Sequence, residues 1–177
     1  MRKLKLDELN RPTINEYKQQ EKLPVTLVLD NVRSALNVGS AFRTADAFAL
    51  ERIYLCGITA KPPHREILKT ALGATAAVQW VYFETIEACI EALQSQEIAI
   101  YAVEQAAERT WLQSFPARDR QPLALVFGNE VDGVSQAVMD VADAALEIPQ
   151  FGTKHSLNVS VSVGIVVWEV WRQLQQE

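Results

Sequence analysis

The sequence lacks the glycine-rich motifs of the common nucleotide-binding proteins. None of its seven glycines forms a G-x-G-x-x-G pattern. Gly128 and Gly133 have the outer spacing of a phosphate-binding loop, but Val-Ser follows them where that loop needs Lys and then Ser or Thr. A G-x-S-x-G nucleophile elbow is also missing. These absences count against dinucleotide oxidoreduction, nucleotide hydrolysis and serine hydrolysis.

Cysteine and histidine are scarce, with two of each in the chain. Cys56 and Cys89 stand far apart in apolar surroundings, and neither lies at metal-ligand spacing from His64 or His155. We therefore expect two buried free thiols in a cytoplasmic protein, with a disulfide as the less favoured alternative and no metal site.

Long hydrophobic runs are also missing. No apolar stretch approaches the roughly 18 residues that a membrane span requires, and the basic start of the chain, residues 1–11, is not followed by the apolar core of a signal peptide. The chain has 177 residues, 49% of them apolar and 22% charged. This composition predicts one soluble domain with no membrane partner.

Charge is distributed unevenly along the chain. Residues 1–69 contain 12 Lys and Arg against 8 Asp and Glu, whereas residues 70–177 contain 5 against 14, within a net charge of −5. Such a split predicts a local basic surface for a polyanion on an acidic protein. Random variation of surface charge is the simpler alternative.

Short apolar segments alternate with helical patterns after an N-terminal extension of residues 1–24. The expected strands are Val25–Leu29, Ile53–Cys56, Val78–Phe83, Ile98–Val103, Leu123–Phe127 and Ala145–Ile148. The expected helices are Val38–Phe48, Thr85–Gln94 (with Thr85 as its cap) and Ser135–Val141. Strands that are apolar on both faces predict an α/β fold with a mostly parallel sheet covered by helices on both faces. Ligands of such sheets bind at the carboxyl ends of the strands.

Two of these strand ends are followed by polar residues that are candidates for a functional site. After the first strand, Asn37 is placed to cap a helix and Arg43 follows close to two turns later. After the fifth strand comes FGNEVDGVS, in which Gly128 allows a close approach and Glu130 is a carboxylate on a tight loop. A capped helix and a solvated turn are the simpler explanations of each segment alone.

The third strand end is IPQFGTKHSLNVS, which offers the hydroxyl of Ser156 and the amide of Asn158. Because the carboxyl ends of parallel strands meet at one edge of a sheet, the three segments together predict one pocket. From Leu157 to Val163 apolar and polar residues then alternate, which is the pattern of a half-buried strand.

Three segments in this order resemble the three motifs of the SpoU, or TrmH, RNA ribose 2′-O-methyltransferases of the SPOUT superfamily. They are NVGSAFRTADAF (37–48), LVFGNEVDGVS (125–135) and IPQFGTKHSLNVSVSVG (148–164). The resemblance covers nearly the whole chain from residue 25 onward. The middle motif has Glu-Val-Asp-Gly where the family usually has Glu-Gly, which removes no polar group that the chemistry uses.

The resemblance implies a single domain over residues 25–177 with a deep C-terminal trefoil knot formed by about residues 123–177. It implies S-adenosylmethionine bound in the knot, and a homodimer whose active site draws on both subunits. It also implies that a helix, and not a strand, starts at Val159. In that helix Ser160, Ser162 and Gly164 would matter for their small size.

The resemblance assigns roles to individual residues. The implied catalytic residues are Arg43, Asn37, Glu130, Asn158 and Ser156. The implied cofactor contacts, largely through the backbone, are Gly128, Ile148, Leu157 and Val103. The basic residues expected to contact RNA phosphates are Arg33, Arg43, Arg52, Lys61 and Arg65, with Lys69 and the N-terminal Arg2, Lys3, Lys5 and Arg11 as further contacts.

The implied reaction transfers a methyl group from a sulfonium to a ribose 2′-oxygen without a metal. Arg43 would act either as the base or as a fixed positive charge beside the developing alkoxide, and the second role suits a guanidinium, which is a poor base. The expected substrate is tRNA, in its D-loop or anticodon loop, with rRNA as the alternative. A catalytically silent RNA-binding protein of the same fold is the competing hypothesis.

Overall fold

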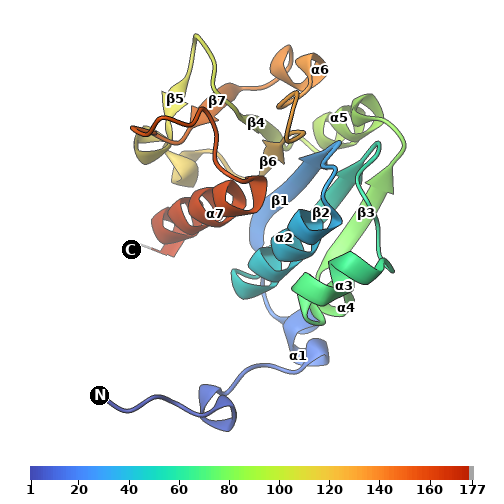
Figure 1. The fold of residues 1–177 in the computed structure, drawn as a ribbon, viewed down its shortest axis with the longest axis vertical. Helices are drawn as coiled ribbons and strands as arrows, with labels where there is room; N and C mark the ends of the chain where they lie inside the picture. The colour runs from blue at the N-terminus through green and yellow to red at the C-terminus, as the bar shows by residue number, and fades with distance from the viewer. Residues whose placement is uncertain (176–177) are drawn as a thin grey trace.

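The computed structural model describes residues 1–175 and, at Leu6 and Asp7, the backbone alone. Seven strands form one sheet in the order β3-β2-β1-β6-β4-β7-β5, and all six strand pairs are parallel (Figure 1). The strands are β1 (Leu23–Asp30), β2 (Leu50–Cys56), β3 (Gln79–Phe83), β4 (Ala99–Val103), β5 (Thr110–Trp111), β6 (Leu123–Phe127) and β7 (Ala144–Glu147). The predicted parallel sheet is confirmed.

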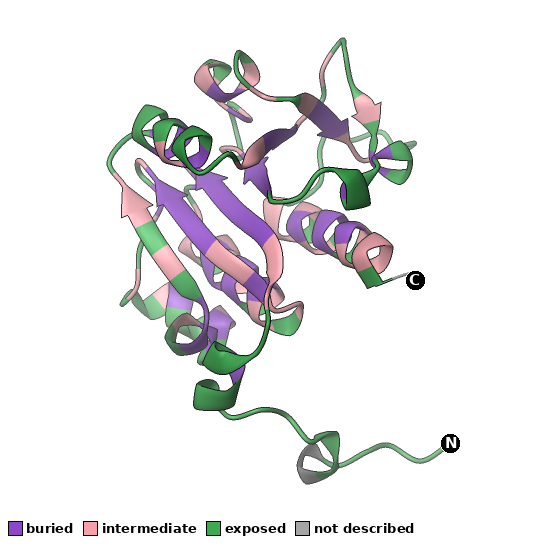
Figure 2. Ribbon diagram, turned by 180° about the vertical axis from the view of Figure 1, so that it is seen from behind, coloured by how far each residue is buried: buried purple, intermediate pink, exposed green. Residues whose placement is uncertain are grey.

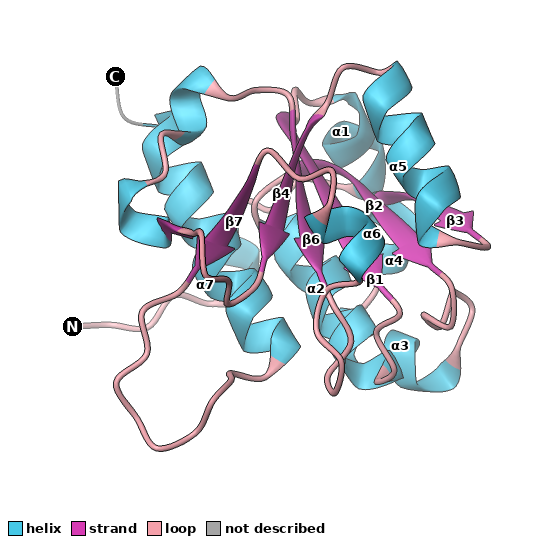
Figure 3. Ribbon diagram, turned by 90° about the horizontal axis from the view of Figure 1, so that it is seen from above, coloured by secondary structure: helices cyan, strands magenta, loops and turns pink. Residues whose placement is uncertain are grey.

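Helices cover both faces of this sheet (Figure 3). The α-helices are α1 (Ile14–Gln19), α2 (Ala35–Ala47), α3 (Arg65–Ala71), α4 (Ala74–Ala77), α5 (Ile86–Ser95), α6 (Gln136–Met139) and α7 (Val159–Gln175). Three short 3-10 helices are η1 (Leu6–Leu9), η2 (Leu112–Ser114) and η3 (Ala117–Asp119). One hydrophobic core lies under α2, α3 and α7, and a second lies under α5 and α6.

The central strands contribute side chains to both cores. In β1, Leu27 and Leu29 join the core under α2, while Val28 between them joins the core under α5. All five residues of β6 are buried, and the middle of the sheet is accordingly the most deeply buried part of the ribbon in Figure 2. A strand that is buried on both faces needs apolar residues at every position, which explains why these strands were predictable as continuous apolar runs.

The helix after β1 begins earlier than predicted, and Asn37 does not cap it. Ser34 is the cap, because its Oγ accepts the N–H of Asn37 at 3.4 Å and α2 starts at Ala35. Ser and Asn cap helices about equally well, so local preference could not choose between the two residues. Thr85 caps α5 as predicted, with its Oγ1 accepting the N–H of Ala88 at 3.3 Å.

The C-terminal segment is a helix from Val159, as the resemblance implied, and the strand predicted by its alternation is wrong. The buried residues of α7 are Val163, Val166, Val167 and Val170, which follow the period of a helix. The expected importance of a small residue at position 164 is also wrong, because a Cβ built on Gly164 meets nothing within 4 Å. Although α7 has 17 residues, no helix within residues 1–175 combines the length and apolar composition needed to cross a membrane.

The N-terminal region is partly docked on the domain. β1 begins at Leu23, inside the predicted extension, and α1 packs through Tyr17, whose buried hydroxyl donates to the carbonyl of Ala45 at 3.3 Å. Cys56 and Cys89 are free and buried, as predicted. Hydrogen bonding with Cys89, together with burial, raises the pKa of the Cys56 thiol, which therefore stays protonated at neutral pH.

The order of the strands places a crevice in the middle of the sheet. From β1 the chain moves outward through β2 and β3 on one side, whereas β6, β4, β7 and β5 lie on the other side of β1. Ligands of open α/β sheets bind at such a reversal, outside the carboxyl ends of the strands. The loops that follow β1, β4, β6 and β7 meet there.

Candidate active site

A pocket of about 810 Å³ lies at this edge of the sheet, between the loops that follow β4, β6 and β7. It has the size of a small-molecule site, for which 300–1,000 Å³ is usual. The structure brings most of the predicted site residues together here. The predicted residues that line the pocket are Val103, Gly128, Glu130, Ile148, Ser156, Leu157 and Asn158.

Three polar side chains, one from each sequence segment, join at the mouth of this pocket. Glu130 accepts hydrogen bonds from the side-chain amide of Asn37 at 3.0 Å and from the backbone N–H groups of Arg33 and Ser34 at 2.8 and 3.1 Å. Asn158 Nδ2 in turn donates to Asn37 Oδ1 at 3.3 Å. Residues 93 and 121 positions apart in the chain are therefore tied into one cluster.

The charge on Glu130 is stabilised by this cluster. Partial burial opposes ionisation, but the N–H donors of Arg33, of Glu130 itself and of Ser34, together with the amide of Asn37, outweigh it and hold the pKa of Glu130 below its ordinary value. Glu130 is therefore a carboxylate at neutral pH. It can accept hydrogen bonds and orient donors, but it carries no proton to donate.

The loop that presents Glu130 is closed by its own backbone. Asn129 and Gly133 exchange two hydrogen bonds, at 2.9 and 3.0 Å, so that Glu130 lies on a tight turn as predicted. A Cβ on Gly128 would lie 2.1 Å from the carbonyl carbon of Gly133, so only glycine fits where these two backbone segments meet. Gly133 has a positive φ of 73°.

Three further residues hold the loops in place and were missed in the sequence. Asp30 is buried and accepts the N–H of Ser135 at 2.9 Å. Asn129 Nδ2 donates to the carbonyl of Asn31 at 2.9 Å. Glu104 accepts the N–H of Val134 at 2.9 Å. Asp30 and Glu104 end or directly follow a buried strand, and an acid at that place is the signal that could have revealed them.

The loop between β7 and α7 forms the remaining wall. Asn158 precedes α7, and its Oδ1 accepts the N–H of Ser160 at 2.9 Å as a helix-capping side chain does. Gln105 Nε2 donates to the carbonyl of His155 at 2.8 Å, which ties this loop to the end of β4. Ser156 is exposed on the pocket wall.

Arg43 is not part of this cluster. It is exposed on α2 and lines a second, shallower groove of about 490 Å³ between α2 and α3, together with Lys69 and Thr70. Within one chain, therefore, Glu130 and Asn37 contact each other and not Arg43.

Of the other predicted basic contacts, Arg33, Lys61 and Arg65 are exposed. Arg33 lies in the loop after β1, which contacts Glu130. Lys61 lies on the segment between β2 and α3, with its ammonium 3.5 Å from the centre of the Tyr82 ring. Arg65 begins α3. These three side chains are available to a ligand.

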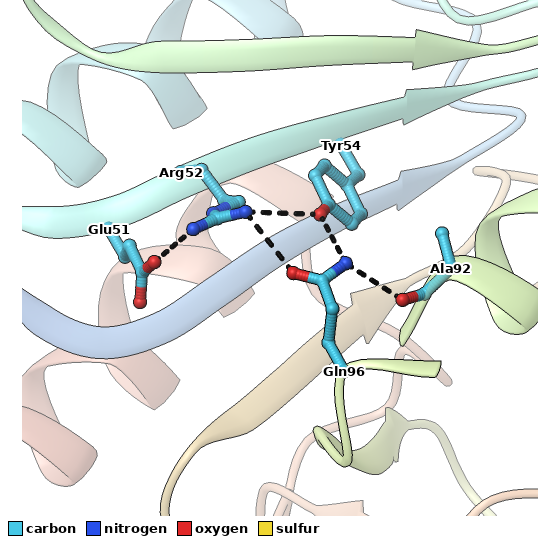
Figure 4. Close-up of polar contacts among 5 residues, drawn as sticks. All are labelled: Glu51, Arg52, Tyr54, Ala92 and Gln96. Carbon is cyan, nitrogen blue, oxygen red and sulfur yellow. Dashed lines mark hydrogen bonds and ion pairs between the residues drawn. The ribbon is translucent and has the colours of Figure 1, made fainter. Parts of the chain in front are cut away.

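Arg52 is engaged within the protein (Figure 4). It lies in the first half of β2, away from the carboxyl ends of the strands, and forms an ion pair with Glu51. Its Nη1 donates to Tyr54 Oη and to Gln96 Oε1, both at 3.4 Å, which ties β2 to the end of α5. We therefore leave Arg52 out of the RNA contacts proposed below.

No group of three or more His, Cys, Asp or Glu side chains in the described part of the chain is placed to hold a metal ion. Two carboxylates of the pocket, Glu130 and Glu104, lie on separate loops and each accepts backbone N–H groups. Their arrangement suits the binding of an organic ligand by hydrogen bonds and apolar contacts.

A family model described as the SpoU rRNA Methylase family matches residues 24–168. The chain belongs to the SpoU rRNA methylase family. All three polar residues of the cluster at the pocket mouth, Asn37, Glu130 and Asn158, fall within the matched residues.

Individual SpoU relatives agree with this result. The 23S rRNA (guanosine-2′-O-)-methyltransferase RlmB of Vibrio parahaemolyticus is 33% identical over 166 residues, which are 94% of this chain and 66% of that protein. The tRNA (guanosine(18)-2′-O)-methyltransferase of Aquifex aeolicus is 29% identical over 93% of this chain and 76% of that protein. The chain thus spans about two thirds of the length of the first of these relatives.

A solved structure has the same fold. The crystal structure of an AdoMet-bound rRNA methyltransferase from Sinorhizobium meliloti has a TM-score of 0.80 and 27% identity to this chain. It covers 94% of this chain, and this chain covers 62% of that one. The parallel sheet and the loops that form the pocket therefore belong to a SpoU methylase fold.

Proposed function

We propose that the protein transfers a methyl group from S-adenosylmethionine to a ribose 2′-hydroxyl of RNA. The observation that carries the proposal is the cluster of Asn37, Glu130 and Asn158 at the mouth of a pocket of cofactor size. Relatives named for rRNA and tRNA 2′-O-methylation, and a neighbour named as AdoMet-bound, support it.

The pocket fits the proposed cofactor. Gly128, whose Cβ position is filled by the backbone of Gly133, presents bare main chain to the pocket, and apolar walls come from Val103, Ile148 and Leu157. Backbone groups and apolar side chains are the usual contacts of an adenosine moiety. The bound cofactor supplies a methyl group on a sulfonium, whose departure as a neutral thioether needs no metal.

Arg43 is proposed to act as a fixed positive charge at the ribose. Its guanidinium keeps its proton in proteins, so it stabilises a developing alkoxide and the adjacent phosphate better than it abstracts a proton. Glu130 and Asn37 are proposed to position the ribose, with Asn158 and Ser156 shaping the loop around it. Proximity of the 2′-oxygen to the methyl carbon then supplies much of the rate enhancement, and the proton of the hydroxyl passes to solvent as the new oxygen–carbon bond forms.

Because Arg43 does not reach the pocket of its own chain, the proposal includes a homodimer in which the partner's Arg43 completes each site. α7 exposes an apolar face of Val161, Ile165 and Trp168, which are 49%, 38% and 50% exposed. Trp168 also packs edge-on against Phe48, which lines the groove of Arg43. An exposed apolar face next to the groove is the kind of surface that a second copy covers.

A substitution on this face tests the dimer. Trp168→Glu places a charge in the centre of the exposed face, and we expect the protein to sediment as a monomer and to lose methyl transfer while it still binds S-adenosylmethionine. Gln175→Glu, at the exposed end of the same helix, is the matched control and should leave the dimer intact. A dimer that survives Trp168→Glu would place the contact elsewhere.

We also propose the deep trefoil knot over about residues 123–177, in a single domain of residues 25–177. Two contacts support it: Gln105 holds the 149–158 loop through His155, and the backbone N–H of Ala117, ahead of β6, donates to Gln173 Oε1 near the end of α7 at 3.0 Å. Both ends of the C-terminal segment therefore contact residues that precede β6 in the chain. An experimental structure traced from residue 123 onward tests the threading.

The RNA is the next part of the proposal. The proposed phosphate contacts are five exposed basic residues, of which Arg43 and Lys69 line the groove between α2 and α3: Arg33, Arg43, Lys61, Arg65 and Lys69. The names of the relatives divide between rRNA and tRNA, so both are tested. tRNA remains the substrate predicted from the sequence, and the protein is proposed to act in the cytoplasm.

Mass-spectrometric mapping of 2′-O-methylated nucleotides, in cells with and without the gene, tests the function. Loss of one methylated nucleotide from tRNA or from rRNA identifies the substrate, and the purified protein should restore it from S-adenosylmethionine. Unchanged methylation together with no cofactor binding in calorimetry would instead support a catalytically silent RNA-binding protein.

A further inference from the structure

Glu104 presents a carboxylate to the pocket, and no role has been given to it so far beyond holding a loop. It directly follows β4 and is partly buried. Its Oε1 accepts the N–H of Gln105 at 2.8 Å, and its Oε2 accepts the N–H of Val134 at 2.9 Å. Each carboxylate oxygen is thus held by one backbone donor.

The other two glutamates that line the pocket, unlike Glu104, are engaged by other side chains of the protein. Glu147 pairs with Arg109 at 2.7 Å, and Glu130 accepts three hydrogen bonds. Within residues 1–175, Glu104 has no ion pair. A carboxylate has about four acceptor positions, and Glu104 uses two of them. Glu104 therefore keeps one free acceptor position on each of two adjacent oxygens.

The surroundings of Glu104 indicate which part of a ligand reaches it. Glu104 follows Val103, its backbone N–H donates to the carbonyl of Leu146 at 3.2 Å, and Val103, Leu146 and Ile148 all line the pocket. The pocket therefore offers apolar side chains at the ends of β4 and β7, where Glu104 also lies. A flat base packs at an apolar wall, and the ribose of an adenosine is attached directly to its base. Its two vicinal hydroxyls match two adjacent acceptors on a strand's carboxyl end.

We propose that Glu104 accepts hydrogen bonds from the ribose 2′- and 3′-hydroxyls of the adenosine part of the cofactor. The inference rests on the proposed cofactor, and it adds a specific side chain to a site whose other expected contacts are largely backbone. Gly133 has a part in it as well, because a Cβ there would lie 2.3 Å from Glu104 Oε2 and would displace the carboxylate.

Chemical deletion of the hydroxyls, combined with Glu104→Gln, tests the proposal. Calorimetry would measure the affinity of the wild-type protein and of Glu104→Gln for S-adenosylhomocysteine and for its 2′-deoxy and 3′-deoxy forms. In the wild type each missing hydroxyl should lower affinity about tenfold. In Glu104→Gln the parent ligand should bind about tenfold more weakly, and removal of the hydroxyls should then cost little more.

Other outcomes overturn the proposal in distinct ways. If Glu104→Gln lowers the affinity for the parent ligand and for the deoxy ligands by the same factor, Glu104 only holds the 128–135 loop. A larger loss for S-adenosylmethionine than for S-adenosylhomocysteine would make Glu104 a counter-charge for the sulfonium. Absence of binding in the wild type would refute the proposed function itself.

Two variants keep the test interpretable. Glu108→Gln changes an exposed glutamate on the same loop that does not line the pocket, and it should bind every ligand as the wild type does. Glu104→Asp keeps the charge, and it replaces Glu104→Gln if that variant does not fold. Because the Asp side chain is shorter, the loss of affinity on removing each hydroxyl should be smaller in Glu104→Asp than in the wild type. A loss as large as in the wild type would contradict the proposal.

Discussion

The two cavities of the molecule differ in the charge of the residues that line them and in how many of those residues form hydrogen bonds or ion pairs within the protein. The pocket at the sheet edge is lined by acids, and Glu130, Asn37 and Asn158 are bound to one another across three segments of the chain. The groove between α2 and α3 is lined by the cations Arg43 and Lys69, and Arg43 has no hydrogen bond or ion pair with the described residues.

One helix belongs to both cavities. α2 carries Asn37 in its first turn and Arg43 six residues later, so the same element positions a residue that contacts Glu130 of the pocket and a residue of the cationic groove. The difference is the basis of the proposed division of labour, in which one cavity would hold the methyl donor and the other the phosphates of the acceptor. The proposed reaction requires the two to meet, which is why a second chain is part of the proposal.

The largest effect is expected for Arg43→Ala. Loss of the fixed charge at the ribose should lower kcat about 100- to 1,000-fold, the usual cost of removing one transition-state contact. Because Arg43 is outside the pocket, the affinity for S-adenosylmethionine in calorimetry should be unchanged. Unchanged turnover would remove Arg43 from the mechanism, and Arg43→Lys shows whether charge alone suffices.

Gly128→Ala should damage the pocket alone. The new methyl group would lie 2.1 Å from backbone atoms of Gly133, so the loop must shift, and we expect at least a tenfold loss of cofactor affinity. Gly152→Ala, in the loop between β7 and α7, is the matched control, since its Cβ meets nothing within 4 Å. Equal affinities for the two variants would contradict the close approach at Gly128.

The cluster around Glu130 should depend on pH in the acidic range. The pKa of Glu130 is lower in the folded protein than its ordinary value of 4.5, so its contribution to stability is fully present above about pH 5 and is lost as pH falls through the folded value. Urea unfolding of the wild type and Glu130→Gln at several pH values measures it. The stability difference should shrink below pH 4.5, and a difference that grows on acidification would reverse the assignment.

Substitutions of two basic residues, one exposed and one engaged within the protein, should have different effects on RNA affinity and on stability. Lys69→Ala should weaken RNA binding several-fold at every sequence and reduce the salt slope by about 1, because one phosphate contact is lost. Arg52→Ala should leave RNA binding unchanged but cost about 1–2 kcal/mol of stability, because Tyr54 and Gln96 lose a partner. Filter binding measures the RNA affinity and thermal unfolding measures the stability. If Arg52→Ala weakens RNA binding and Lys69→Ala does not, the RNA-binding surface would include β2 and not the groove.

The smallest effect is expected at Gly164. Within its own chain, alanine there adds a methyl group to open space, so in the monomeric Trp168→Glu background Gly164→Ala should stabilise the protein by about 0.5–1 kcal/mol. Chemical denaturation measures the change. Destabilisation would restore the idea that this helix needs a small residue at position 164.

The sequence predicted the central strands well because each is buried on both faces and apolar throughout. It missed α3 and α4, whose buried residues, Ile67, Ala71, Ala74 and Ala77, are mostly alanines and give a weak hydrophobic period. It also missed β5, which has two residues and exists only because it pairs with β7. Short elements of this kind depend on tertiary contacts that no local pattern contains.

The sequence predicted which residues belong to the site, but not the hydrogen bonds that join them. Seven predicted residues line one pocket because they end or follow β4, β6 and β7, which end at one edge of the sheet. The hydrogen bonds of Asp30, Asn129 and Glu104 join residues that are distant in the sequence, so local patterns could not reveal them. Arg43 is separated from Glu130 because six residues of α2 place it about 9 Å along the helix and about 120° around its axis from Asn37, which contacts Glu130.

The central claim is that each active site combines the pocket of one chain with Arg43 of the other, and subunit mixing tests it most directly. Arg43→Ala and Glu130→Ala chains, each inactive alone, would be co-expressed with different tags and the heterodimer purified. One of its two sites then has both residues intact, so we predict about half of the wild-type methyl transfer activity. A heterodimer as inactive as its two parents would show that Arg43 acts within its own chain, and would contradict the shared site.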